Sequence, residues 1–288
     1  MCCPALLFML AFNYMPMFGI IIAFKTFRVD KGILGSPWSG LNNFRFYFTS
    51  QDAWRTTRNT VTLNFLFIAA GLVISLLLAV LISDIKSKKL TKTYQTAMFF
   101  PYFVSWVVAG YMVYAFLAGD HGIFNKILLS LGMEKVNWYM QADIWPAILL
   151  IAHIWKDSGY YCIIYYAGIM GIDETYYEAA KIDGASRFTM MMKITIPLLS
   201  PLISIMLILQ IGKIFYADFG MFFHLTKDIG ALYKTTDVID TYVYRSLRVL
   251  GDFGMASAAG LYQSVVGFIL VILTNTVVGK IDSDNKLF

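Results

Sequence analysis

Five stretches of the chain contain no charged residue and are each long enough to cross a lipid bilayer. They are 1–24, 59–83, 93–119, 194–212 and 253–279. A helix needs about 20 mostly apolar residues to span the hydrocarbon core of a membrane. Only 14% of the 288 residues are charged and 58% are hydrophobic, whereas a soluble domain has roughly 25% charged residues. This composition excludes an ordinary water-soluble enzyme.

A sixth stretch, 144–172, is equally apolar but is interrupted by the adjacent Lys156 and Asp157. Together the six stretches predict an all-α integral membrane protein that folds as a single transmembrane domain over 1–288. The connections between them are too short for a separate soluble domain. The predicted spans are 3–24, 61–83, 97–117, 144–170, 198–219 and 256–278.

The opening run, 1–24, has no basic residue before its apolar part and is too long for a cleaved signal peptide. We therefore expect it to be the first span. Because it begins directly within apolar sequence at Met1, we also expect the natural N-terminus to lie further upstream.

The placement of basic residues predicts the orientation in the membrane, because short loops rich in Lys and Arg stay in the cytoplasm. Total counts do not decide the side, since the loops of one face hold twelve basic residues and those of the other face nine. The densest cluster lies within 84–96 and favours a cytoplasmic location for that loop, for 171–197 and for both termini. It consists of Lys86, Lys88, Lys89 and Lys92.

Several functions find no support in the residues present. The net charge of +5 is spread over short connections and forms no basic patch for nucleic acid. No G-x-x-x-x-G-K-[ST] phosphate loop occurs, so any ATP must be bound by another subunit. The cysteines imply no disulfide framework, and the histidines show no metal-ligand spacing, so we predict no cofactor, metal or catalytic residue in this chain. These residues are Cys2, Cys3, Cys162, His121, His153 and His224.

The connection 171–197, between the fourth and fifth predicted spans, carries signals for two short helices joined by a sharp turn. Asp173 and Ser186 are suited to cap the starts of the two helices. Gly184 suits the left-handed position that follows the first helix. Pro197 falls in the opening turn of the fifth span, where its missing N–H costs least.

The first of these helices has the features of a docking surface. Glu178 offers a fixed negative charge to a basic group of a partner. Ala179 and Ala180 allow another surface to approach closely. This geometry alone leaves open an ordinary interfacial helix that only joins two spans.

The same loop resembles a known family. Its spaced residues are Glu178, Ala179, Ala180, Gly184, Ile194, Ile196 and Pro197. This pattern resembles the EAA loop of binding-protein-dependent ABC importer permeases, which ends in Leu-Pro, so Ile196 is a conservative departure. In that family the loop forms a helix seated in a cleft of a cytoplasmic ATPase subunit. The resemblance implies ATPase-coupling roles for Glu178, Ala179, Ala180, Asp183, Gly184 and Pro197.

The resemblance extends over nearly the whole chain and is closest to the maltose-transporter type of carbohydrate permease, in its oligosaccharide and polysaccharide-fragment branch. The stretches that resemble this branch are 14–19, 23–25, 58–60, 236–245 and 258–264. The resemblance implies one half of a saccharide translocation pathway in the bacterial cytoplasmic membrane. The implied partners are a second homologous permease, two ABC ATPase subunits that hold ATP and Mg, and an extracytoplasmic solute-binding lipoprotein.

Polar side chains inside the predicted spans are candidates for the translocation pathway. A charged group at the centre of a bilayer costs about 2.5 to 3.5 kcal/mol on insertion scales, so such groups mark function by default. Sugars suit a polar and aromatic path, because hydroxyls need hydrogen-bond partners and sugar rings stack on aromatic side chains. The candidates are Trp155, Lys156, Asp157, Tyr160, Tyr161, Gln210, Lys213 and Asp218.

The charges among these candidates have two interpretations. Lys156 paired with Asp157 or Asp218 would only neutralise charge near a helix end. By resemblance, the surrounding segments match family segments that touch sugar, but the maltose-specific protein is uncharged there. This departure favours a charged or larger saccharide, such as a uronate-containing oligosaccharide, bound by Lys156 or Lys213.

Three other functions stay open from the residues. One is an ABC permease for a solute other than sugar. Another is an ion-coupled secondary transporter in which Asp157 and Asp218 carry the ion, although the two halves of the chain do not mirror each other as inverted repeats often do. The third is an intramembrane enzyme that uses Asp157 or His153.

Overall fold

The computed structural model describes residues 3–281, and this part of the chain is helical with no β-strand. The prediction of an all-α protein is confirmed. Residues 1–2 and 282–288 lie outside the described residues, so the cytoplasmic position of the two termini stays a prediction.

The helices follow one another with short connections. The first are α1 (Cys3–Met9), η1 (Leu10–Tyr14), η2 (Met15–Phe24), α2 (Gly32–Gly35), α3 (Asn42–Thr49) and α4 (Gln51–Ser83). The middle of the chain forms α5 (Lys88–Phe99), η3 (Phe100–Phe103), α6 (Trp106–Leu117), α7 (Ile123–Ser130), η4 (Trp138–Met140), η5 (Ala142–Ile144) and α8 (Trp145–Ile169). The last are α9 (Glu174–Ile182), α10 (Arg187–Met190), η6 (Met191–Thr195), α11 (Ile196–Leu198), α12 (Ser200–Ile211), α13 (Phe219–Thr226), η7 (Gly230–Leu232), α14 (Tyr233–Thr236), α15 (Ile239–Arg248) and α16 (Phe253–Ile281).

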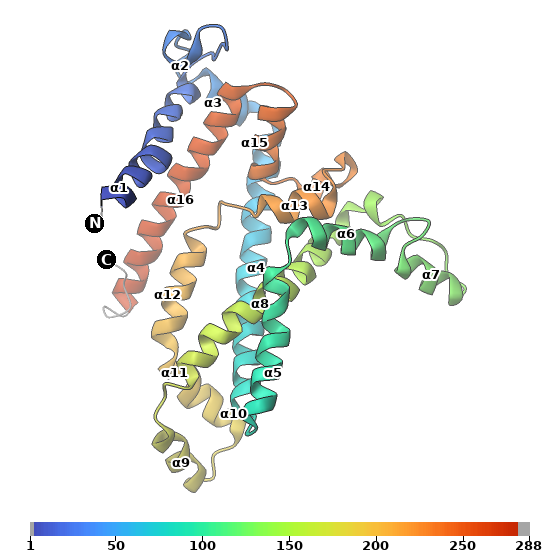
Figure 1. Cartoon of the computed structure of the whole chain (residues 1–288), viewed down its shortest axis with the longest axis vertical. Helices are drawn as coiled ribbons and strands as arrows, with labels where there is room; N and C mark the ends of the chain where they lie inside the picture. Colours follow the sequence, from blue (N-terminus) through green and yellow to red (C-terminus); the bar gives the residue numbers. More distant parts are fainter. Residues whose placement is uncertain (1–2, 282–288) are drawn as a thin grey trace.

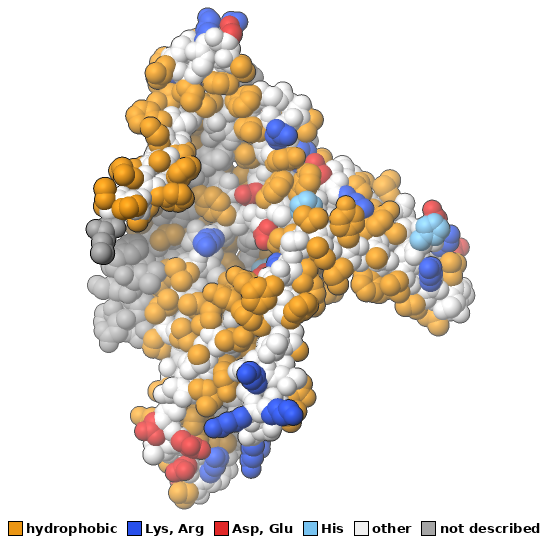
Figure 2. Space-filling model, viewed as in Figure 1, with side chains coloured by type: hydrophobic (Ala, Val, Ile, Leu, Met, Phe, Trp, Pro, Cys, Tyr) orange, Lys and Arg blue, Asp and Glu red, His pale blue; other side chains and the backbone are white. Residues whose placement is uncertain are grey.

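The molecule is elongated, with α9 at one end and α2 at the other, while α6 and α7 project to one side (Figure 1). Charged side chains gather at the α9 end, and the surface between the two ends is mainly hydrophobic (Figure 2). Such a large apolar surface is stable only against lipid or another protein.

The first helical segment, from α1 to η2, runs without a break over Cys3–Phe24 and coincides with the first predicted span. It lies beside α16, which returns along it from the α2 end (Figure 1). The rest of the chain buries none of its apolar window. Phe12 and Phe18, for example, are exposed. This segment therefore has the surface of a helix surrounded by lipid or by a partner.

α4 and α8 pack along each other at the centre of the molecule. Ser50 caps α4 by accepting a hydrogen bond from the Ala53 N–H at 3.3 Å, so the helix begins well before the predicted second span. Ala79 of α4 and Cys162 of α8 belong to one buried cluster, where small side chains let the two helices approach closely. This pair is the frame on which the other helices are arranged.

The third predicted span, 97–117, is not one straight helix. α5 and η3 meet α6 at a bend of 96°. Pro101 lies in the first turn of η3 and has no N–H to continue the helical ladder. Ser105 then starts α6 by accepting a hydrogen bond from the Val108 N–H at 3.3 Å. The expectation of a continuous helix is corrected to a broken one.

The fifth predicted span, 198–219, also differs from the structure, because its helix ends at Ile211. The chain then runs irregularly to the start of α13. The Asn64 side-chain amide of α4 donates hydrogen bonds to the carbonyls of Ile214 and Tyr216, at 2.8 and 3.2 Å. These long-range bonds replace the helical ones and fix the irregular segment.

The helical segment Arg187–Leu198 joins α12 at a bend of 64°. Among the described residues, three helices are long and apolar enough to cross a membrane, and five are counted if each bent pair is one span. α8 has 25 residues and carries Lys156 and Asp157. The six-span topology therefore stays a prediction.

Candidate functional site

The loop 171–197, which we call the coupling loop, has the local geometry predicted for it. Asp173 caps α9, and its Oδ1 accepts hydrogen bonds from the N–H and the hydroxyl of Thr175, both at 2.9 Å. These bonds stabilise the carboxylate and lower the pKa of Asp173 below its usual value. Gly184 has a φ of 75°, and Ser186 accepts a hydrogen bond from the Thr189 N–H at 3.1 Å to start α10. The predicted caps and turn are confirmed.

The predicted coupling residues lie on the outside of the molecule. Of these residues Ala180 is half-buried, and the others are exposed; they are Glu178, Ala179, Asp183, Gly184 and Pro197. Ile182, which the sequence analysis did not single out, is 87% exposed at the end of α9.

One contact holds the two ends of the coupling loop together, and another joins the loop to α4. The Tyr177 hydroxyl lies 2.9 Å from the Thr195 hydroxyl oxygen. Arg187 donates a hydrogen bond to Asp84, at the end of α4, at 2.9 Å. α9 is thus bonded to the segment that leads into α12, and α10 is bonded to the end of α4.

A cavity of about 470 Å³ lies among α4, α8, α12 and the segment that leads into α13. We call it the central cavity. Its lining combines aromatic, polar and apolar side chains from segments that are distant in sequence. The lining residues are Asn64, Phe67, Ile68, Tyr102, His153, Asp157, Tyr160, Tyr161, Met206, Leu209, Gln210, Lys213, Ile214, Tyr216, Asp218 and Met221.

Six of the eight pathway candidates from the sequence line this cavity. They are Asp157, Tyr160, Tyr161, Gln210, Lys213 and Asp218. The structure places the other two, Trp155 and Lys156, outside it. Trp155 is 39% exposed on α8. Neighbouring residues of α8 therefore face different surroundings. Their adjacency in the sequence does not show which of them line the cavity.

Lys156 is buried and bonded within the chain. Its Nζ donates hydrogen bonds to the carbonyls of Tyr102 and Val104, at 2.7 and 2.6 Å. The ammonium also lies 5.2 Å from the centre of the Trp106 ring, a favourable cation–π distance. Lys156 thus satisfies the carbonyls that the break between α5 and α6 leaves free. Neither aspartate proposed as its partner, Asp157 or Asp218, forms an ion pair with it among the described residues.

Both carboxylates of the central cavity have partners of their own. Asp157 lies 3.1 Å from Nδ1 of His153, one turn earlier on α8. The His153 ring stacks on Phe67, with ring centres 4.6 Å apart. Asp218 accepts hydrogen bonds from the Trp106 indole N–H and, at 3.2 Å, from the backbone of α13. These bonds hold both carboxylates at fixed places in the cavity wall.

The remaining lining offers an aromatic surface and a free cation. Tyr102 and Tyr160 stack with ring centres 4.7 Å apart and an interplanar angle of 12°. Lys213 is also part of the lining and forms no ion pair among residues 3–281. The cavity therefore presents flat apolar faces, fixed acceptors and a lysine without an ion-pair partner among the described residues.

Sequence reasoning missed several residues of the central cavity, chiefly Asn64, Tyr102, His153 and Tyr216. The spacing of His153 and Asp157 by four residues on an apolar helix was a usable signal, because such residues share a face. No comparable signal marks Asn64, whose role depends on a segment 150 residues away.

Residues 71–282 match the family described as the inner membrane component of binding-protein-dependent transport systems. The chain belongs to this family. It is a membrane-embedded permease subunit of an ABC importer and not an enzyme, as the EAA-like loop indicated.

The chain is 34% identical over 281 residues to Protein LplB of Bacillus subtilis (strain 168), which covers 98% of this chain and 88% of that protein. It is 34% identical over 277 residues to the polygalacturonan/rhamnogalacturonan transport system permease protein YteP of the same organism, with 96% and 86% covered. A solved bacterial ABC transporter involved in import of the acidic polysaccharide alginate has a subunit 33% identical, with a TM-score of 0.88 and 97% and 93% covered. The resemblance to carbohydrate permeases is confirmed.

Proposed function

We propose that the chain forms half of a translocation pathway for an oligosaccharide or polysaccharide fragment and that the central cavity is its saccharide site. The observation that carries this proposal is the lining of the cavity. Tyr102 and Tyr160 form a flat stacked pair beside Gln210, Asp157 and Lys213. Sugar rings stack on aromatic faces, while their hydroxyls bond to amide, carboxylate and ammonium groups.

The size of the cavity and the relatives support the same conclusion. About 470 Å³ falls within the range of roughly 300 to 1,000 Å³ that small-molecule sites occupy. One relative is named as a permease for polygalacturonan and rhamnogalacturonan, and one similar structure belongs to an alginate importer. Both of these substrates are polysaccharides.

The proposed importer has four further chains. The second permease completes the pathway, two cytoplasmic ATPase subunits bind ATP and Mg, and an extracytoplasmic binding protein, a lipoprotein, delivers the saccharide. A similar solved structure contains a periplasmic protein with a bound alginate pentasaccharide, which supports the last part. The exposed α9, with Glu178 and Ile182, supports docking of an ATPase at the coupling loop.

The transport mechanism we propose is alternating access. Closure of the ATPase pair would move α9, and the contacts of Tyr177 and Arg187 would carry the movement to α12 and α4. The central cavity lies between these helices, so it would open to one side of the membrane at a time. Direction follows from which state ATP and the loaded binding protein each favour.

We also propose six spans with both termini in the cytoplasm of a bacterial cell membrane. Single cysteines introduced at 86–92 into a cysteine-free chain should resist an impermeant thiol reagent in intact cells. Cysteines at 125–135 should react. Labelling in the reverse pattern would put the coupling loop out of reach of any cytoplasmic ATPase.

The saccharide site is tested by uptake measured with the whole importer in proteoliposomes. Tyr160→Ala removes one ring of the stacked pair, and an aromatic contact contributes about 0.5–1.5 kcal/mol, so the apparent KM should rise roughly three- to tenfold. Ile151→Ala is the matched control, because Ile151 is exposed on the same helix and lies outside the cavity. Equal uptake by both variants would show that the sugar does not use this cavity.

A further inference from the structure

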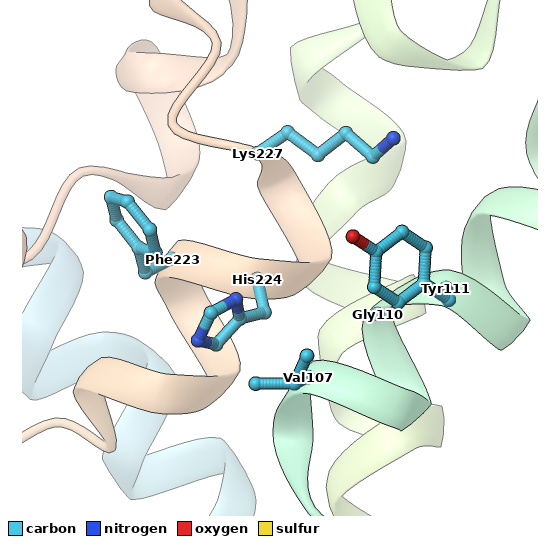
Figure 3. A pocket seen from close by; sticks show the side chains of 6 residues that line it. All are labelled: Val107, Gly110, Tyr111, Phe223, His224 and Lys227. Atoms are coloured by element: carbon cyan, nitrogen blue, oxygen red, sulfur yellow. The ribbon is translucent and has the colours of Figure 1, made fainter.

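A second pocket, of about 310 Å³, lies between α6 and α13 (Figure 3). Its lining residues are Val107, Gly110, Tyr111, Phe223, His224 and Lys227. At Gly110 the two helices meet in backbone contact, since a Cβ there would come within 2.7 Å of the His224 carbonyl oxygen. The floor of the pocket is therefore fixed by backbone, while Tyr111 is 69% exposed at its rim.

Backbone geometry at the end of α13 separates two opposite charges. Lys227 and Asp228 are consecutive and have φ values of 55° and 50°, which non-glycine residues adopt only when their surroundings hold them. Asp228 is held by Arg245, which donates to it at 2.7 Å, and by the Tyr233 hydroxyl at 3.1 Å. Asp228 is thus bonded elsewhere and is not part of the pocket lining, whereas Lys227 borders the pocket (Figure 3).

The charge of Lys227 has no carboxylate to neutralise it. Its Nζ lies 3.2 Å from the centre of the Tyr114 ring, and none of the ion pairs within residues 3–281 includes it. The pocket lining contains no acidic side chain, whereas the central cavity contains Asp157 and Asp218. This second pocket is thus the more favourable of the two for an anion.

We infer that this pocket, the Lys227 pocket, is a second saccharide subsite that binds sugar units carrying a carboxylate. Lys227 binds the carboxylate, and the exposed ring of Tyr111 and the half-buried ring of Phe223 offer faces for the sugar. The inference rests on the proposed saccharide function and adds that the substrate is acidic. The alginate importer is similar in this respect, because its substrate is described as an acidic polysaccharide.

The two pockets share no lining residue, although both border α13. Asp218 and Met221 border the central cavity, whereas His224 and Lys227 border the second pocket. The Lys227 pocket is therefore separate from the central cavity, and its loss should leave the lining of that cavity intact.

The test compares trigalacturonate with its fully methyl-esterified form, which has the same length and no charge. Uptake is measured in proteoliposomes that contain the whole importer and its binding protein. Lys227→Met removes the charge and keeps a long side chain at the strained position. We expect its apparent KM for trigalacturonate to rise about tenfold, since bonds to charged groups are the strong ones. The KM for the ester should not change, and Lys227→Arg should restore import of the acid. Lys126→Met, an exposed lysine on α7, is the matched control.

The outcomes separate the inference from the function on which it rests. No saccharide import by the wild-type importer would overturn the proposed function. If the wild-type importer transports saccharide but Lys227→Met changes the KM for the acid and the ester equally, only the role of the Lys227 pocket would be overturned. A defect that vanishes when anionic phosphatidylglycerol is replaced by neutral phosphatidylcholine would assign the pocket to a lipid headgroup and would also overturn the inference. Loss of assembly in Lys227→Met would make the lysine a contact to another chain, unless the neutral but polar Lys227→Gln assembles and shows the selective loss of acid import.

Discussion

The coupling loop, 171–197, and the broken segment, 99–106, both interrupt regular helix, but different interactions hold them. In the coupling loop each cap is formed by residues two or three positions apart, such as Asp173 with Thr175. In the broken segment the free carbonyls of Tyr102 and Val104 are bound by Lys156, more than 50 positions away. The shape of the coupling loop is thus determined by neighbouring residues in the sequence. The shape of the broken segment depends on contacts with α8.

This difference matters for function, because the two regions do different work. The coupling loop is an exposed element that another subunit is proposed to move, so its shape must persist while its surroundings change. The broken segment supplies Tyr102 to the central cavity, so its shape must follow α8. Changes at the break should therefore disturb the whole fold, and changes in the loop should disturb transport alone.

The largest effect is expected at Gly159, where α8 crosses the end of α5. A Cβ at this position would lie 1.9 Å from the Met98 carbonyl oxygen, and the backbone on both sides has to move to accept it. Overpacking of this kind costs about 1–3 kcal/mol or more. Gly159→Ala should therefore lower the yield and the Tm of the assembled importer. Gly260→Ala, with nothing within 4 Å of its new Cβ, is the control and should leave both unchanged.

A slightly smaller effect is expected for Lys156→Met. The change leaves two carbonyls without their donor, and losing a charged hydrogen-bond donor costs about 1.5–3 kcal/mol. The Tm of the purified importer should fall, with uptake per assembled complex falling as the Tyr102 ring moves. Lys213→Met should leave the Tm unchanged, since Lys213 forms no ion pair in the described chain. A Lys156→Met importer with normal Tm and no uptake would restore Lys156 as a substrate contact.

The same contrast explains how much could be predicted from the sequence. The helical class, the caps at Asp173 and Ser186 and the turn at Gly184 follow from local residue preferences and were predicted. Most of the charged candidates for the central cavity were found too, because a charge inside an apolar run is conspicuous. Lys156 was conspicuous for the same reason, yet its partners are carbonyls from another helix. No local pattern specifies such a partner.

The irregular segment after Ile211 shows the same limit. The predicted fifth span, 198–219, continues the helix past Ile211, and Gly212 alone does not forbid it. The structure ends the helix because Asn64 binds two carbonyls of the segment and Gln263 binds the carbonyl of Phe215. Each of these donors lies far away in sequence. The sequence therefore predicted several residues of the cavity, but it did not predict the irregular backbone on which some of them lie.

Within the coupling loop, Gly184→Val should have a moderate effect confined to coupling. The φ of 75° at Gly184 costs a residue with a Cβ about 1–2 kcal/mol, and a β-branched side chain is among the least tolerant. Assembly of the membrane part should persist, while ATP hydrolysis stimulated by the loaded binding protein should fall. Gly184→Asn should retain most of the stimulated ATP hydrolysis, because asparagine adopts left-handed conformations readily. Wild-type stimulation in Gly184→Val would show that the turn is not needed for coupling.

The smallest effect is expected at Asp173, whose carboxylate caps α9 on a fully exposed surface. Its pKa is lowered by the two hydrogen bonds from Thr175, so it is ionised more readily in the folded loop than in an unfolded chain. Because the pKa is lowered on folding, the ionised carboxylate stabilises the folded loop fully at pH values above the pKa of the unfolded chain, near 3.8. This stabilisation is lost as the pH falls through the lowered pKa of the folded loop. Amide exchange of α9 in the intact importer should therefore be equally protected at pH 7 and pH 5. Asp173→Ala should lose protection at both values, whereas Asp173→Asn, which can still accept the Thr175 N–H, should keep most of it. Loss of wild-type protection between pH 7 and pH 5 would mean that a group other than Asp173 holds the start of the helix.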